Sequence, residues 1–176
     1  MTSKPSQKIP LGRLEKVDWR TCWNEEDAEF TVWLAQAENI KLLGELIGRK
    51  LEVVPHGQFN LLTTDILCHD PAIDGWVLIK SQLEMTDITT HLGQILADMA
   101  SLQAATIIWI AGTFTPEHQA RLKWLNQITL PEFHFLGLEI ELWRIGELVA
   151  PKFSLVVQPT DWKTGNRRIP INLRKR

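Results

Sequence analysis

Cysteine is scarce in this sequence of 176 residues, tyrosine is absent, and no apolar run is long. Cys22 and Cys68 have no partner at zinc-ligand spacing and are too few for a disulfide framework. The longest apolar stretches, such as ATIIWIA at 105–111, fall well short of the roughly 18 to 20 residues of a membrane span, and the amino terminus lacks a signal-peptide core. The ten glycines are scattered, without a phosphate-binding loop or dinucleotide fingerprint. We therefore expect a cytoplasmic protein with reduced cysteines and no membrane contact.

The composition is that of a globular protein, but the charge is unevenly distributed. Hydrophobic residues make up 44% of the chain, which suits one compact domain. We place this domain at residues 11–162, after a disordered start at residues 1–10. Residues 1–162 hold 13 basic and 21 acidic residues, a net charge of −8, whereas residues 163–176 hold six basic residues and no acidic one.

This basic tail has two interpretations. A cationic segment suits contact with a nucleic-acid backbone. The alternative is a solvated tail that contacts its own acidic surface or nothing. The candidate nucleic-acid-binding residues are Lys163, Arg167, Arg168, Arg174, Lys175 and Arg176.

Apolar spacing alternates between a helical period and a strand period. It predicts a helix over 29–48, strands over 51–54, 60–68 and 76–84, a helix over 87–102, a strand over 106–110, a helix entered at Thr115 and Pro116, a strand over 133–143 and an added edge at 153–157. A connection rich in breakers, at 69–75, joins the second and third strands. The core order αβββαβ, followed by αβ, predicts an α/β domain with a mixed sheet and helices on its faces.

The predicted strand at 76–84 carries an unusual polar face. Alternation places Lys80, Gln82 and Glu84 together on one side of this otherwise apolar strand. A solvent-facing edge strand would explain the same pattern. On the neighbouring strand, Asp65 lies among apolar residues, where an unpaired charge is costly to bury. Asp65 is therefore either a strand-end residue or a group held for a purpose.

With these residues the sequence resembles the PD-(D/E)XK restriction-endonuclease-like superfamily. The segment VLIKSQLEMTDITTHLGQ at 77–94, with IIWIAGTF and GLEIELWRIG further on, is similar to a bacterial family of such domains whose motif reads close to ENQLExTDHxHLGQ. The resemblance runs from about residue 11 to residue 162. It implies a restriction-endonuclease-like fold, magnesium-assisted phosphodiester hydrolysis and, by analogy, a homodimer.

The resemblance also implies roles for individual residues. Asp65 matches the metal-binding aspartate, and Gln82 matches a position that is lysine in the superfamily and commonly glutamine in this branch. Glu45 resembles an extra acidic residue that some members place beside the metal. His91 and Gln94 match the helix that follows the site. Asp87 lies four residues before His91 and could assist the site, although a plain helix-surface role explains the pair as well.

Lys80 departs from the family pattern, because it stands where the metal-binding glutamate belongs. Magnesium takes oxygen ligands, and an ammonium group repels it. We expect Lys80 to pair with Asp65. We expect no cofactor if the site is impaired. If the site is active, we expect it to bind Mg²⁺ through Asp65. Glu84 or Glu45 would then supply the missing carboxylate, although Glu84 lies two residues further along the strand.

Three functions follow from this departure. The first is a nuclease-derived protein that associates with nucleic acid, most simply DNA, and has lost or weakened hydrolysis. The second is an active magnesium-dependent DNA endonuclease. The third is a non-catalytic protein-interaction or regulatory subunit. We expect the first, which leaves enzymatic activity open.

Overall fold

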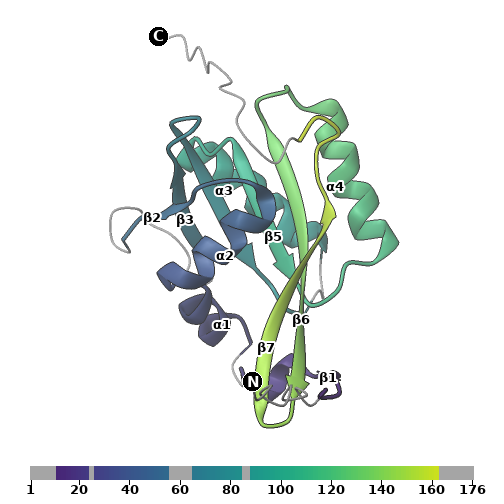
Figure 1. Cartoon of the computed structure of the whole chain (residues 1–176). Coiled ribbons are helices and arrows are strands. Elements are labelled where there is room, and N and C mark those ends of the chain that lie inside the picture. Colours follow the sequence, from purple (N-terminus) through teal and green to yellow (C-terminus); the bar gives the residue numbers. More distant parts are fainter. Residues whose placement is uncertain (1–10, 24–25, 56–64, 85–87, 163–176) are drawn as a thin grey trace, which may run out of the picture.

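The computed structural model describes residues 11–23, 26–55, 65–84 and 88–162. Its elements are β1 (Glu15–Val17), the short 3-10 helix η1 (Trp19–Thr21), α1 (Glu26–Leu34), α2 (Ala37–Ile47), β2 (Glu52–Val53), β3 (Asp65–Asp70), β4 (Gly75–Ser81), α3 (Ile88–Leu102), β5 (Thr106–Ala111), α4 (Pro116–Ile128), β6 (His134–Ile145) and β7 (Leu148–Val157). The strands form one seven-stranded sheet of order β1-β6-β5-β4-β3-β2, with β7 also paired to β6 (Figure 1). β4, β5 and β6 run parallel, and the other pairs are antiparallel. The predicted mixed α/β architecture is confirmed.

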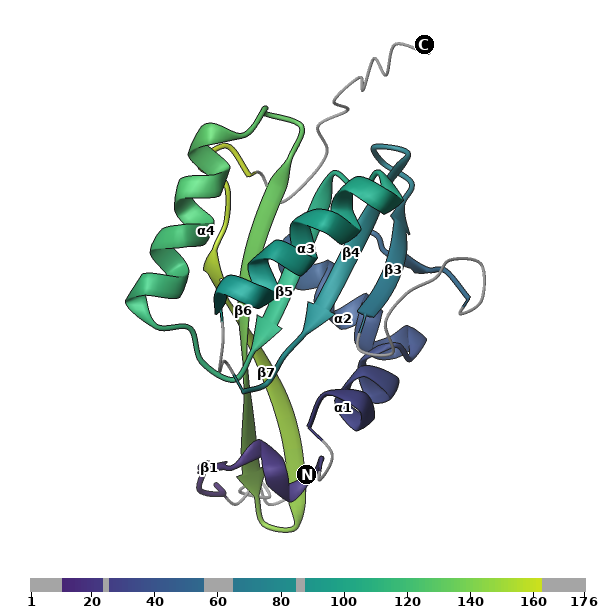
Figure 2. The same ribbon diagram turned by 180° about the vertical axis from the view of Figure 1, so that it is seen from behind.

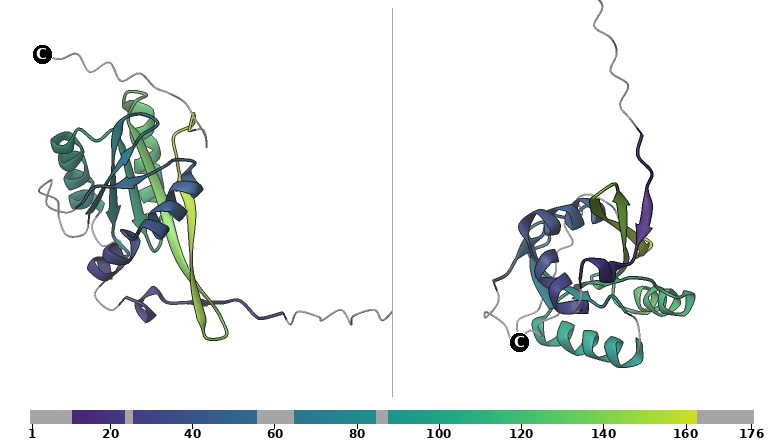
Figure 3. Two further views of the ribbon diagram at one scale, coloured as in Figure 1. Left: turned by 60° about the vertical axis from the view of Figure 1, so that its left-hand side comes forward. Right: turned by 90° about the horizontal axis from the view of Figure 1, so that it is seen from below.

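Helices cover both faces of this curled sheet. α1 and α2 lie on one face, and α3 and α4 lie on the other, as Figure 2 shows from behind and Figure 3 from the side and from below. Alternating strand residues belong to two separate hydrophobic cores. Ile108 packs towards α1 and α2, whereas Trp109 packs towards α3 and α4. Every residue of β5 is buried, as predicted for a strand covered on both faces.

The single helix predicted over 29–48 is wrong, because the chain forms two helices there. Gln36 takes an extended backbone conformation and begins α2 as its N-cap residue. The Asn39 side chain donates to the Trp33 carbonyl at 2.7 Å, which satisfies a carbonyl left open at the end of α1. α2 ends at Gly48, whose positive φ of 70° suits the glycine C-cap of a helix.

The other predicted elements are found with shifted ends. β3 continues to Asp70 and β4 begins at Gly75, so the connection between them is shorter than the predicted 69–75. β7 begins at Leu148, five residues before the predicted edge, and β1 and η1 were not predicted. Residues 60–64 of the second predicted strand, the start at 1–10 and the tail at 163–176 lie outside the described residues.

No helix within the described ranges is both long enough and apolar enough to cross a membrane.

β6 and β7 form a long hairpin that extends beyond the helical layers (Figure 3). Its tip is the two-residue turn Gly146–Glu147, where Gly146 has a φ of 60°. A positive φ at the first turn position is what glycine provides in tight hairpins.

Candidate functional site at the end of β4

Lys80 and Gln82 come from the end of an interior strand. β4 pairs with β3 on one side and with β5 on the other, and the Gln82 backbone N–H extends the pairing by donating to the Ile110 carbonyl at 2.8 Å. Lys80 is only 4% exposed and Gln82 only 5%. This burial excludes the solvent-facing edge strand as the explanation of the polar pattern.

The two faces of this strand end differ in chemistry. Ser81, which points towards α1, shares a buried hydrogen bond of 2.5 Å with the Thr31 hydroxyl. That contact ties α1 to the sheet and places Ser81 away from Lys80 and Gln82. Lys80 and Gln82 therefore lie on the face covered by α3 and α4.

The backbone register brings Asp65 and Lys80 together. The two residues are direct partners in the antiparallel β3–β4 ladder. Directly opposed residues of such a ladder lie on the same face of the sheet, with Cβ atoms about 5 Å apart as a rule. The predicted juxtaposition of these two positions is thus present in the backbone.

Two buried polar atoms at this strand end have no hydrogen-bond partner among the described residues. They are Gln82 Oε1 and Trp109 Nε1. Trp109 is the β5 residue in register with Lys80, and its side chain is fully buried. An amide oxygen can accept a hydrogen bond and an indole nitrogen can donate one. The site thus combines a buried cation with one acceptor and one donor.

The structure does not bring the two predicted supplementary carboxylates to this position. Glu84 lies beyond the end of β4, has a side chain 48% exposed and pairs with Arg20 at 2.9 Å. Glu45 lies on the outer side of α2, with a side chain 65% exposed and Lys41 at 3.9 Å. No described contact joins either carboxylate to Lys80 or Gln82.

The remaining predicted residues are placed outside the buried cluster or outside the described ranges. Gln94 is exposed on α3 and donates to Asp98 at 2.8 Å. His91 is half-buried in the first half of the same helix. Asp87 and the six tail residues at 163–176 lie outside the described part of the chain.

Among the described side chains at this position, Lys80 carries an ammonium group, which is not an oxygen ligand of the kind that magnesium takes. Lys80 lies opposite Asp65 in the ladder, and the two predicted supplementary carboxylates, Glu84 and Glu45, are paired with Arg20 and Lys41. In the ranges that the structure describes, no three His, Cys, Asp or Glu side chains are grouped in a way that could hold a metal ion.

A cleft of about 400 Å³, which was not predicted from the sequence, is a separate feature of the structure. It lies between β1, η1, β6 and the start of α4, and Glu141 is one of its lining residues. A hydrogen bond from Lys16 at 2.6 Å, with others from Lys152 and Trp143, lowers the pKa of Glu141 to about 2. The alternation of Glu139 and Glu141 with apolar residues gave no signal for this network, because a solvent-facing strand shows the same pattern.

Comparisons with known proteins add no family to these observations. No protein-family model matches the chain, no curated protein matches it, and no solved structure matches it.

Proposed function

We propose that this protein is a nuclease-derived, restriction-endonuclease-like domain that associates with nucleic acid and whose metal-dependent cleavage is lost or weakened by Lys80. The observation that carries the proposal is the position of Lys80, buried on an interior strand and paired in register with Asp65. The motif around it, KSQLEMTDITTHLGQ at 80–94, supplies the resemblance to a nuclease family.

The charge at position 80 supports loss of the metal. Replacing a carboxylate by an ammonium group changes the local charge by two units. At ~4 Å and an effective dielectric constant of ~20, one unit charge acts on another with roughly 4 kcal/mol. A divalent cation beside Lys80 is repelled in proportion to both charges, and burial of Lys80 limits screening by solvent.

The described contacts of Glu84 and Glu45 favour this function over an active endonuclease. An active site would need one of these carboxylates next to Asp65. Instead, each is exposed and paired with a cation elsewhere. A rearranged strand end would be required to bring Glu84 back.

Association with nucleic acid is supported by the separation of charge. Residues 163–176 carry six positively charged side chains and no negatively charged one, whereas residues 1–162 carry a net charge of −8. Phosphate contacts by lysine and arginine release counterions, so such a segment can bind a nucleic acid although the whole chain is slightly acidic. Lys80 offers a further positive charge at the proposed site.

A variant series at position 80 tests the metal argument. We expect the wild-type protein not to cleave linear or circular DNA with Mg²⁺ or Mn²⁺, and Lys80→Glu to gain Mn²⁺ binding measured by calorimetry. Lys80→Gln is the matched control, because it removes the positive charge without adding an anionic ligand. Circular dichroism and thermal melts check that each variant is folded. Efficient cleavage by the wild type that disappears in Asp65→Ala would overturn the impaired-site proposal.

Nucleic-acid binding needs its own measurement. We expect DNA affinity to fall with salt in the intact protein, and the slope of log affinity against log salt to lose up to about 5 when all six tail cations are changed to glutamine. An equal number of Lys or Arg→Gln changes at exposed sites of residues 11–162 is the control. No affinity at low salt in the intact protein would contradict this proposal and favour the protein-interaction subunit.

A further inference from the structure

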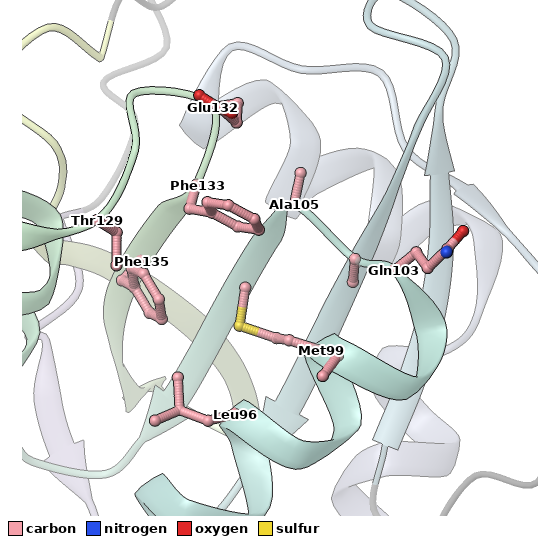
Figure 4. A pocket seen from close by; sticks show the side chains of 10 residues that line it. Leu96, Met99, Gln103, Ala105, Thr129, Glu132, Phe133 and Phe135 are labelled. Carbon is pink, nitrogen blue, oxygen red and sulfur yellow. The ribbon is translucent and has the colours of Figure 1, made fainter. Parts of the chain in front are cut away.

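An apolar groove lies on the α3 and α4 face, at the end of the sheet where β5 and β6 begin. Its volume is about 440 Å³. Figure 4 shows the side chains of Leu96, Met99, Phe133 and Phe135 converging on it, with Glu132 at one end. Leu96 is 42% exposed and Phe133 is 37% exposed, so apolar surface lies open to solvent here. Exposed apolar grooves of this kind commonly receive another segment of protein.

The described chain ends at Trp162, on the face of the sheet opposite this groove but at the same end of the sheet. Trp162 packs its ring 5.1 Å from that of His134, the first residue of β6. Phe133 and Phe135, on either side of His134 in the chain, line the groove on the opposite face of the sheet. The His134 N–H donates to the carbonyl of Ala105, which also lines the groove. Trp162 and the groove therefore lie at the same end of the sheet.

The sequence after Trp162 holds a segment whose chemistry matches the groove. Within KTGNRRIPINLRKR, the residues Ile169, Ile171 and Leu173 recur with a period of two, which puts them on one side of an extended chain. Pro170 disfavours a helix and restricts the unfolded chain, so docking an extended segment costs less conformational entropy. Basic residues flank the apolar triplet on both sides.

Length and charge both permit this segment to reach the groove. Seven residue-to-residue steps lead from Trp162 to Ile169, a reach of about 23 Å, whereas packed layers are roughly 10 Å apart. Glu132 at the rim is acidic, and residues 1–162 are net −8 against +6 in the segment. A short tether also gives the segment a high effective concentration at the groove.

We propose that residues 169–173 dock in this groove as an extended segment of the same chain, with Ile169, Ile171 and Leu173 inserted and the flanking cations outside. The inference goes beyond the proposed function and does not depend on it. The six cations remain available for phosphate contacts, because only the apolar side chains enter the groove.

Photo-crosslinking in the full chain tests the docking. With p-benzoyl-phenylalanine at position 171, irradiation should give crosslinks within one chain to Met99, Leu96 or Phe133, at a yield independent of protein concentration. Ala100→Trp fills the groove and should abolish these crosslinks. Ala97→Trp is the matched control, because Ala97 is exposed on the same helix and does not line the groove.

Proteolysis supplies a second readout that needs no crosslinker. Trypsin should cleave after Arg168 slowly in the wild type and in Ala97→Trp, and several-fold faster in Ala100→Trp. Equal cleavage rates and equal crosslink patterns in the two tryptophan variants would overturn the proposal. Crosslinks that join two chains and rise with concentration would also overturn it and assign the groove to a second copy. Crosslinks to other parts of the surface would have the same effect.

Discussion

Cys22 and Cys68 differ in reactivity because they differ in burial. Cys68 lies in β3 with no exposed surface, and burial raises the pKa of its thiol to about 12. At pH 8 only roughly one Cys68 in 10,000 is then a thiolate, which is the reactive form. Cys22 is exposed. A thiol reagent at pH 8 should therefore label one cysteine in the native protein and two in denaturant. Cys22→Ser should show no rapid labelling, and two rapid equivalents in the wild type would contradict the buried position of Cys68.

At the scale of single residues, only some features of the candidate site could be predicted from the sequence. Alternation along one strand was enough to place Lys80 and Gln82 on a common face. Their burial was not predictable, because it depends on β5 pairing beside β4, which is a tertiary property. Glu45 was assigned through resemblance alone, and its exposed position on α2 does not bring it to Lys80.

At the scale of elements, predictions succeeded where the signal was local. α3 and β5 follow from an apolar stripe and an apolar run, and α4 begins where Thr115 and Pro116 indicated. The Thr115 hydroxyl accepts from the His118 N–H at 3.3 Å, as an N-cap residue does. The division between α1 and α2 escaped prediction because its extended residue, Gln36, is neither glycine nor proline. Only the packing of two helix axes against the sheet distinguishes that case from one continuous helix.

β7 shows how an irregular strand can still complete a sheet. Its first half contains Pro151, which lacks a backbone donor and is tolerated at a strand edge. Among the described strands β7 pairs only with β6, so its other side is an edge. Pro151 and Lys152 both discourage a further strand from pairing there. The outer edge of β7 is therefore a poor surface for pairing with a strand of another chain.

At the scale of the whole molecule, one polar cluster joins distant parts of the chain. The Arg49 guanidinium lies 3.8 Å from the Asp70 carboxylate and is covered by the Trp162 ring at 4.6 Å. The Trp162 indole N–H donates to the Ile47 carbonyl at 3.1 Å, and its ring contacts His134. The ends of α2 and β3, the start of β6 and the residues after β7 thus meet in one place.

This cluster makes stability depend on pH through His134. Burial lowers the pKa of His134, and the positive charge of Arg49 lowers it further, although Asp161 and Glu132 act in the opposite direction. The folded state therefore favours neutral imidazole, while an unfolded histidine takes up a proton near pH 6.5. As the pH falls below about 6.5, protons bind the unfolded chain more readily, so the free energy of unfolding decreases until the folded-state pKa is reached.

The size of the effect can be measured by urea unfolding between about pH 5 and pH 7.5, where His134 should contribute a slope of at most about 1.4 kcal/mol per pH unit. His134→Gln should remove this part of the slope, because glutamine does not titrate and keeps a polar side chain near the Thr106 hydroxyl, which lies 3.3 Å from His134 Nδ1. His118→Gln is the control, since glutamine also serves in a capping box and His134 remains to give the wild-type slope. The titration of carboxylates contributes to the slope in all three proteins, so this contribution cancels when the three slopes are compared. Equal pH profiles for His134→Gln and the wild type would show that the imidazole is not held neutral by this cluster.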